Sequence, residues 1–291
     1  MRIRIILLTL FSAFLLQSCL KDKVLYTYTI ARPVYEEKSV VYANIKSNAP
    51  QQVEHPGKIY LYGNYIFLSE VDKGVHIIDN SNPASPVRKA FINIPGNLDI
   101  AVKGNTLYAD LYSDMVVVDI TNPLAARFVR YIPNVFPYRY TEYGFTSDSS
   151  RVIVDWIRKD TTVNHSDFLE YYKADMMVFA STSNGASTQN GGVRSPMGVA
   201  GSMARMSIVG DFMYCVNTYN LLSYQLDQPT DPQKTATNNV GWNIETIYPF
   251  RNKLFIGSSN GMFIYDITNP AVPVRESQFS HARACDPVIS D

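Results

Sequence analysis

Oxygen-bearing side chains recur at one spacing in this sequence, and they are the first candidates for chemistry. The segment DITNP occurs at residues 119–123 and again at 266–270, and the related DNSNP occurs at 79–83. Carboxylate and amide oxygens grouped in this way could bind a hard cation such as Ca²⁺. The side chains that could supply these oxygens are Asp79, Asn82, Asp119, Asn122, Asp266 and Asn269.

A tight turn explains the same residues without a cation. Ca²⁺ takes about 6–8 oxygens from a converging loop, whereas each of these segments ends in a proline that fixes a turn. An Asp side chain can instead accept backbone N–H groups of the residues that follow it, which is an Asx turn. We therefore predict structural turns at these positions, with no metal site and no cofactor.

The other reactive residues form no recognised catalytic motif. The four histidines (His55, His76, His165 and His281) are scattered and show no H-x-H or H-x-x-x-H spacing. No G-x-S-x-G elbow, phosphate-binding loop or C-x-x-C pair occurs. Cys215 and Cys285 could meet only if the fold brought their Cα atoms within about 7 Å. We expect that they are not bonded to each other, and that His76 has a packing role within a strand.

A repeat of about 40 residues contains the proline turns. Strand-like stretches end at Asp79, Asp119, Gln225 and Asp266, and each is followed by a turn that contains proline. The interval from 119 to 225 leaves room for one further, enlarged unit, with strands predicted at 140–145, 151–157 and 175–179. Short strands joined by Gly-Asn-type hairpins, repeated at this period, are typical of β-propeller blades.

The strand-and-turn pattern resembles a known repeat. The stretch MVVVD followed by ITNP resembles the LVIVD repeat of bacterial and archaeal surface proteins, and the resemblance covers most of residues 58–281. The stretches GSMAR (201–205) and GWNIE (241–245) are also similar to parts of lipoproteins of this kind. The resemblance implies an all-β propeller of four-stranded antiparallel blades, anchored at the cell surface. It implies no catalytic residues.

The N-terminal residues 1–18 are predicted to be a lipoprotein signal peptide. Arg2 and Arg4 precede an apolar stretch at residues 5–16, which is shorter than the roughly 20 residues that span a bilayer. The sequence LQSC at 16–19 then matches a bacterial lipobox, so that Cys19 would carry the lipid and become the N-terminus. Because residue 20 is Leu rather than Asp, we expect an outer-membrane or cell-surface location.

We expect two further regions after the signal peptide. Residues 19–50 would be a lipidated tether, and residues 51–291 would be the propeller, with about five blades and the start of another. Residues 285–291 resemble the first strand of a further unit, so we expect an incomplete ring with an exposed edge. The alternative is that residues 24–50 supply the strands that close the ring.

The predicted ligand site lies where the innermost strand of each blade begins, at one mouth of the central channel. The candidate rim residues are Asp99, Arg205, Trp242, Asn243, Glu245 and Asp286. A solvated channel mouth that binds nothing would explain the same residues.

Two functions remain open from the sequence. The first is a non-catalytic binding or scaffolding module for a surface protein or a glycan. The second is an extracellular hydrolase or lyase, which rests on analogy with other propellers alone. Lysine plus arginine and aspartate plus glutamate both number 26, and this balance argues against a nucleic-acid partner.

Overall fold

The computed structural model describes residues 25–137, 145, 147, 150–164, 178–180, 204–259 and 261–280. The chain divides into two units, and each is described by itself. The larger unit comprises Pro33–Trp156 and Asn190–Asp291, and the smaller comprises Met1–Arg32 and Ile157–Gln189. Over the described part of the chain, the structure contains no helix with the length and apolar character needed to cross a membrane.

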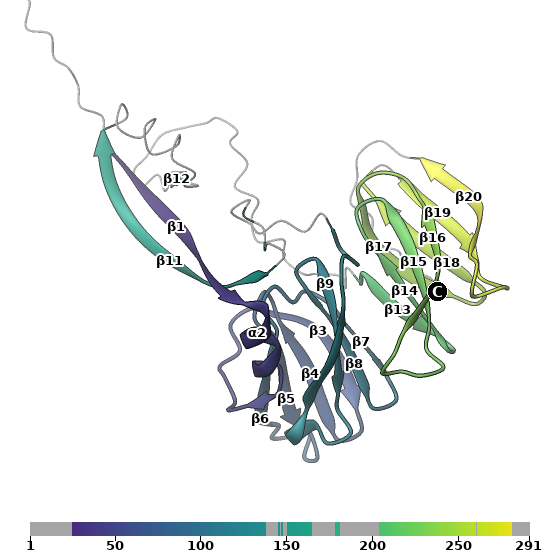
Figure 1. The fold of residues 1–291 in the computed structure, drawn as a ribbon, viewed down its shortest axis with the longest axis horizontal. Helices are drawn as coiled ribbons and strands as arrows, with labels where there is room; N and C mark the ends of the chain where they lie inside the picture. The colour runs from purple at the N-terminus through teal and green to yellow at the C-terminus, as the bar shows by residue number, and fades with distance from the viewer. Residues whose placement is uncertain are drawn as a thin grey trace, which may run out of the picture. The chain divides into compact units, whose positions relative to one another are not determined.

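The described residues of the larger unit form four antiparallel sheets, which we number 1 to 4 along the chain (Figure 1). Sheet 1 consists of β2 (Ser47–Asn48), β3 (Pro56–Tyr62), β4 (Tyr65–Glu70), β5 (Gly74–Asp79) and β6 (Val87–Asn93). Sheet 2 consists of β7 (Ile100–Lys103), β8 (Thr106–Leu111), β9 (Asp114–Asp119) and β10 (Arg127–Ile132). Sheet 3 consists of β13 (Met206–Val209), β14 (Phe212–Val216), β15 (Asn220–Gln225) and β16 (Gln233–Asn239). Sheet 4 consists of β17 (Ile244–Phe250), β18 (Lys253–Ser258), β19 (Gly261–Asp266) and β20 (Val274–Ser280).

Local sequence explains why the four sheets are so similar. In each sheet, four consecutive strands pair in sequence order, and the short hairpin before the second strand contains a residue with positive φ. Gly63, Gly104 and Gly210 adopt φ values of 54°, 55° and 58° in three of these hairpins. Glycine adopts such φ values without a steric penalty. The predicted blade of four antiparallel strands is therefore confirmed, with β2 added to sheet 1 as a fifth strand.

Apolar residues that alternate along the strands pack each sheet onto the next. One core joins sheets 1 and 2 through residues such as Phe67 and Ile100, and a second joins sheets 2 and 3 through Tyr108 and Cys215. A third core joins sheets 3 and 4. Over the described residues the sheets form a consecutive row and not a closed ring, as predicted (Figure 1).

The enlarged third unit differs from the prediction, because sheets 2 and 3 pack directly on each other. The strand that we predicted at 151–157 is β11 (Arg151–Asn164), which continues seven residues beyond the predicted end. It belongs to a three-stranded sheet with β1 (Leu25–Glu37) and β12 (Val178–Ala180), in the order β11-β1-β12. The strand at 140–145 cannot be compared, since only Phe145 of it lies within the described residues. The sequence signalled a strand near 151, but its partner comes from the N-terminal region.

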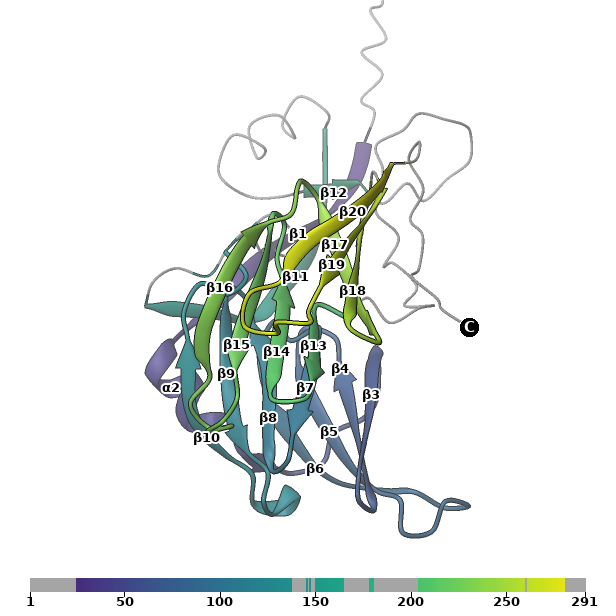
Figure 2. The same ribbon diagram turned by 90° about the vertical axis from the view of Figure 1, so that its right-hand side faces the viewer.

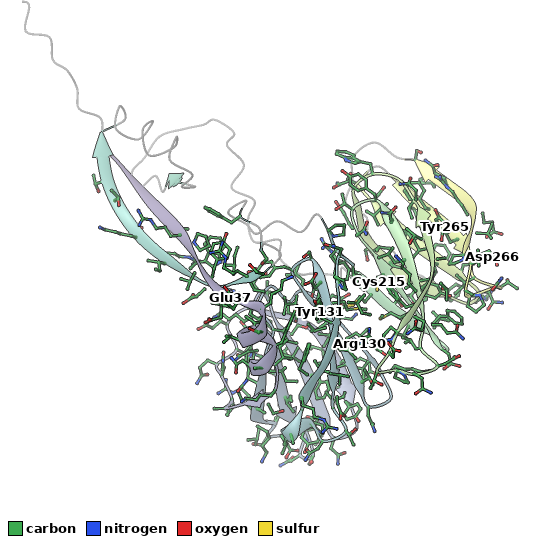
Figure 3. The ribbon with its side chains drawn as sticks, in the orientation of Figure 1. Glu37, Arg130, Tyr131, Cys215, Tyr265 and Asp266 are labelled. Atoms are coloured by element: carbon green, nitrogen blue, oxygen red, sulfur yellow. The ribbon has the colours of Figure 1, made fainter. Side chains whose placement is uncertain are left out.

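In the part of the chain that the structure describes, two short helical segments accompany the sheets. The helix α2 (Lys38–Asn44) follows β1, and its Val41 belongs to the core that joins sheets 1 and 2. The 3-10 helix η1 (Pro123–Ala125) forms the turn after β9. Of the cysteines, Cys215 is buried and free of a disulfide (Figure 3). Cys285 lies outside the described residues.

Tyrosine hydroxyls connect each of two sheets to a proline turn of the following sheet. Tyr108 of sheet 2 donates a hydrogen bond to the carbonyl of Pro229, at 2.6 Å. Tyr214 occupies the same register position in sheet 3 and donates to the carbonyl of Pro270, at 2.9 Å. Burial raises the pKa of Tyr214 to about 12 and also raises the pKa of Tyr108. The second DITNP segment therefore receives a contact that holds neighbouring sheets together.

Candidate functional site

The segments that connect one sheet to the next lie beside the hairpins that join the second and third strands of a sheet. These segments and hairpins together form one edge of the larger unit. We call this edge the rim. Its members are Asp72, Gly96–Asp99, Tyr112–Ser113, Asn134–Phe136, Arg205, Thr218–Tyr219, Trp242–Glu245 and Ser259. Backbone hydrogen bonds fix it, including Gly96 N to Asp72 O (2.8 Å), Phe136 N to Ser113 O (2.9 Å) and Ser259 N to Asn243 O (3.2 Å).

Four residues occupy the same register position where the first strands begin at the rim. Each of them lies four residues before the last residue of the first strand of its sheet. They are Lys58 in sheet 1, Asp99 in sheet 2, Arg205 in sheet 3 and Thr246 in sheet 4. The first strands β3, β7, β13 and β17 contact one another in this order (Figure 2). The side chains of neighbouring sheets therefore start at the same level of the rim, which allows them to interact across sheets.

Asp99 uses this arrangement to join three sheets. Its Oδ1 accepts hydrogen bonds from Nζ of Lys58, at 2.8 Å, and from the backbone N–H of Ile100, at 2.8 Å. Its Oδ2 accepts the backbone N–H groups of Arg205, at 2.6 Å, and Met206, at 2.7 Å. The carboxylate therefore cross-links sheets 1, 2 and 3 through their first strands.

Both carboxylate oxygens of Asp99 already accept hydrogen bonds from groups of the protein. Its side chain is only 3% exposed. Burial raises the pKa of Asp99, whereas the ammonium group of Lys58 and the N–H of Met206 act in the opposite direction. A ligand could reach this carboxylate only by displacing these donors, so we describe Asp99 as a clamp between sheets.

A second buried carboxylate, Asp110, fixes the chain that leads into β7. Its Oδ1 accepts the backbone N–H groups of Leu98, at 2.7 Å, and Asp99, at 2.9 Å, together with the side-chain amide of Asn97, at 2.9 Å. Sequence reasoning missed this residue. The available signal was an acidic residue near the end of the second strand, in the segment ADLYSD.

Glu70 performs a similar role in sheet 1 and forms a buried pair with His76. Its carboxylate accepts the backbone N–H groups of Glu54, at 3.2 Å, and of His55, and lies 2.8 Å from Nε2 of His76. Burial acts to raise the pKa of Glu70, but the hydrogen bonds from His55, His76 and Glu54 lower the pKa below its usual value. The ring of His76 also packs edge-on against Phe91. His76 is thus held by packing and by one carboxylate inside sheet 1.

The exposed part of the rim is centred on Trp242, whose side chain is 61% exposed. The next residue, Asn243, has a positive φ of 56°, and its side-chain amide lies 3.4 Å from the carboxylate of Glu245. Gly241 donates its N–H to the carbonyl of Tyr219, at 3.3 Å. Trp242 is therefore exposed in a rim segment whose backbone is held by hydrogen bonds, and in the same segment the amide of Asn243 contacts the carboxylate of Glu245.

The remaining predicted residues fall into two groups. Arg205 is half-buried, and it follows Ala204, whose carbonyl accepts the N–H of Ile247 at 2.9 Å. The entries to β13 and β17 are therefore neighbours, which brings Arg205 close in space to the chain around Glu245. Asp286 and the predicted lipidation residue Cys19 lie outside the described residues.

The aspartates of the repeated turns lie at the end of each third strand that is away from the rim. Asp79 accepts the N–H of Ser81 at 2.9 Å, and Asp119 accepts that of Thr121 at 2.9 Å. Asp266, which is labelled in Figure 3, accepts that of Thr268 at 2.7 Å. Hydrogen bonds from Ser81 and Thr121 to the carboxylates lower the pKa values of Asp79 and Asp119. This is the geometry of an Asx turn.

The asparagines fix the second half of the same turns. Asn82 Oδ1 accepts the N–H of Ala84 at 3.2 Å, and Asn122 Oδ1 accepts that of Leu124 at 3.0 Å. The backbone carbonyl of Asn269 accepts the N–H of Val272 at 3.2 Å. Among the residues that the structure describes, no three His, Cys, Asp or Glu side chains are grouped so that they could hold a metal ion.

We predict that Asp266 titrates well below an ordinary aspartate. Lys253 lies 2.6 Å away, and its hydrogen bond and that of Thr268 lower the pKa of Asp266 from 3.8 to about 2. The stabilisation from the ionised group is therefore present above about pH 4 and is lost as the pH falls towards 2. Carboxyl ¹³C NMR should show a midpoint near 2, and Lys253→Met should move it towards 3.8. Lys89→Met is the control and should leave the midpoint of Asp266 unchanged, because Lys89 pairs with Asp79 in sheet 1. A wild-type midpoint near 4 would contradict the prediction.

Comparison with known proteins identifies the repeat. The model of the LVIVD repeat matches residues 56–93, 97–129 and 252–279, which lie in sheets 1, 2 and 4. No curated protein sequence matches the chain. Matched solved structures include the computationally designed protein Ika8 (7% identity, 84% of this chain, 55% of that chain, TM-score 0.47). The periplasmic gluconolactonase PpgL of Pseudomonas aeruginosa also matches (12% identity, 82% of this chain, 60% of that chain, TM-score 0.48).

A third match is the β-propeller domain of Cps50 (Swd1) from Myceliophteria thermophila (11% identity, 81% of this chain, 76% of that chain, TM-score 0.36). The chain spans 55% and 60% of the lengths of the first two solved structures. Because all three TM-scores are below 0.5, the assignment rests on the repeat model and on the sheets themselves. The chain therefore contains LVIVD repeats, and these repeats form antiparallel sheets of the β-propeller type.

Proposed function

We propose that this protein is an exported, lipid-anchored binding module that presents the exposed rim of its LVIVD-repeat propeller to a surface glycan. Cys19 would carry the lipid, and the rim residues Trp242, Asn243 and Glu245 would contact the ligand. The observation that carries the proposal is the exposure of Trp242 in the same hydrogen-bonded rim segment as the contact between Asn243 and Glu245.

The chemistry of these three residues suits a flat polar ligand. A tryptophan offers a large rigid apolar face with few rotatable bonds, and tryptophan is enriched among residues that dominate binding energies. The amide of Asn243 and the carboxylate of Glu245 can donate to and accept from hydroxyl groups. A sugar ring presents both an apolar face and hydroxyls, so we favour a glycan over a surface protein.

The alternative function, an extracellular hydrolase or lyase, would need carboxylates aimed at a substrate. Among the described residues, the buried carboxylates at or next to the rim are those of Glu70, Asp99, Asp110 and Asp114, and each accepts a backbone N–H group of the protein. Their contacts favour a structural role, so binding remains the function that we propose.

A glycan array probed with the full chain in mild detergent tests the proposal. We expect Trp242→Ala to weaken binding by about 30-fold, the effect of losing a dominant aromatic contact, and Arg205→Ala to weaken it less. Val274→Ala is the matched control, since Val274 is also 61% exposed but pairs with Asp266 at the opposite end of sheet 4. Glycan binding that survives both rim variants would overturn the proposal, as would binding only to a surface protein in a parallel pull-down.

A separate measurement tests the anchor. The wild-type chain should fractionate with membranes, and Cys19→Ala should release the exported protein into the soluble fraction, because lipid attachment requires the thiol. Equal membrane association of both forms would overturn the lipid anchor and leave the rim proposal unaffected.

A further inference from the structure

The segment that precedes β3 runs along the outer strands of sheets 1 and 2. We call residues 38–48 of this segment the strap, which comprises α2, β2 and the residues between them. Figure 2 shows α2 beside β10, the outer strand of sheet 2. The side chains of Val41 and Ile45 are buried in the core that joins the two sheets. The strap is therefore packed as part of the larger unit.

The first residue of the strap reaches the rim. Nζ of Lys38 lies 2.8 Å from Oδ2 of Asp114, the first residue of β9, whose side chain is only 3% exposed. Oδ1 of Asp114 accepts the backbone N–H of Asn134 at 3.1 Å. Asn134 lies in the rim segment that leads away from sheet 2. One buried carboxylate therefore contacts both the strap and the rim.

The middle of the strap follows β10 away from the rim. The ring of Tyr42 stacks on those of Phe128 and Tyr131, with centroid distances of 4.9 and 4.8 Å. The carbonyl of Ile45 accepts the N–H of Phe128 at 2.9 Å. Stacked aromatic pairs contribute stability beyond the area that they bury. These contacts connect the two ends of the strap along one strand.

The far end of the strap binds the proline turn of sheet 2. Oγ of Ser47 donates a hydrogen bond to the carbonyl of Pro123, at 2.6 Å, and accepts the N–H of Ala126, at 3.0 Å. Ser47 also pairs with Ile92 of β6. Ser47 thus joins sheets 1 and 2 at the end opposite to the rim.

Ser47 takes the place of a tyrosine hydroxyl. Between sheets 2 and 3, Tyr108 donates to the carbonyl of Pro229, in the turn after the third strand. In sheet 1 the register position of Tyr108 is occupied by Phe67, which has no hydroxyl group. The corresponding carbonyl in the next sheet is that of Pro123, to which Ser47 donates. The strap therefore supplies a hydrogen bond that Phe67 cannot make.

We propose that the strap is a latch that couples the proline turn of sheet 2 to the rim. Ser47 closes the interface of sheets 1 and 2 at one end, and Lys38 holds the rim through Asp114 at the other. Because stacking and backbone contacts join the two ends, the strap should open as one unit. Opening would leave the buried carboxylate of Asp114 without its counter-ion, so the rim around Asn134 would loosen.

Amide hydrogen exchange of the full chain in mild detergent tests the coupling from both ends. Ser47→Ala should speed exchange of the Asn134 amide by about 5- to 30-fold, because losing one such contact shifts an opening equilibrium by that factor. Lys38→Met should speed exchange of the Phe128 amide by a similar factor. Lys89→Met is the control and should change neither amide, since it alters an exposed ion pair within sheet 1.

Amides of sheet 4 distinguish opening of the strap from unfolding of the whole chain. They should exchange at the wild-type rate in every variant, because sheet 4 does not contact the strap. The proposal would be overturned if each variant changed exchange only at its own end of the strap. Equal acceleration in sheet 4 would also overturn it, since the strap would then not open separately.

A rescue experiment tests the role of Ser47. Phe67→Tyr should restore most of the stability to urea that Ser47→Ala removes, because the new hydroxyl lies at the register position of Tyr108. In the wild-type background the same change should stabilise less, since the carbonyl of Pro123 already has a donor. Equal effects of Phe67→Tyr in the two backgrounds would show that the hydroxyl does not replace Ser47, which would overturn this part of the latch.

Discussion

Replacing Asp99 with alanine should destabilise the protein by about 3–5 kcal/mol, the cost of breaking a buried charge pair by removing one partner. The carboxylate accepts hydrogen bonds from Lys58, Ile100, Arg205 and Met206. Its loss would leave the ammonium group of Lys58 without its counter-ion and buried N–H groups without an acceptor. Three sheets would lose their shared contact at the rim. The midpoint of urea unfolding, followed by tryptophan fluorescence, measures the effect.

Lys103→Ala is the matched control for this prediction. Lys103 also pairs across sheets, with Asp211 at 2.8 Å, but the two side chains are 30% and 66% exposed. An exposed ion pair contributes less than about 1 kcal/mol. If Asp99→Ala cost no more than Lys103→Ala, the clamp would not be a major source of stability, and Asp99 would be open to a role with a ligand.

Replacing Gly74 with alanine should cost about 3 kcal/mol or more, since it combines backbone strain with overpacking. Gly74 begins β5 with a φ of 144°, which side chains rarely adopt. A Cβ atom there would lie 2.0 Å from the carbonyl oxygen of Ile92 and 2.8 Å from the nitrogen of Ile94. Because both obstacles are backbone atoms, β5 and β6 would have to separate. Thermal unfolding monitored by circular dichroism should show a clearly lower midpoint.

The hairpin glycines provide the comparison. Gly63 and Gly104 also have positive φ values, but a Cβ at either position would have no neighbour within 4 Å. Their replacement with alanine should cost about 1–2 kcal/mol, the penalty of the left-handed conformation alone. Equal costs at Gly63 and Gly74 would mean that the close approach of β6 contributes nothing.

The predicted strands of the repeat were correct where the signal was local. The stretch 75–79 forms the last five residues of β5 and 115–119 the last five of β9, because alternation along a strand and a glycine hairpin are both short-range features. The enlarged unit was less predictable. Its strand β11 pairs with β1, which is more than 100 residues earlier in the sequence, and no local pattern specifies such a partner.

The candidate site was likewise predictable only in its local features. Asp99 could be placed at a strand entry from the register of the repeat, but its partners Lys58 and Arg205 are 41 and 106 residues away. The sequence predicted Asp99 as a ligand-binding residue of the rim, whereas its contacts in the structure make it a clamp between sheets. The buried pair of Glu70 and His76 was missed because nothing in the sequence separates a strand-end glutamate in solvent from one that accepts two backbone N–H groups.

The repeat, the all-β class and the positions of the proline turns could be predicted from the sequence, because strand alternation and turn chemistry act over a few residues. Packing between the sheets was needed to show that Asp99 is buried in a contact between sheets, whereas Trp242 remains exposed. It also decided that sheets 2 and 3 are neighbours. The physical reason is that burial and hydrogen-bond pairing depend on segments distant in the sequence, whose proximity is settled only when the sheets pack.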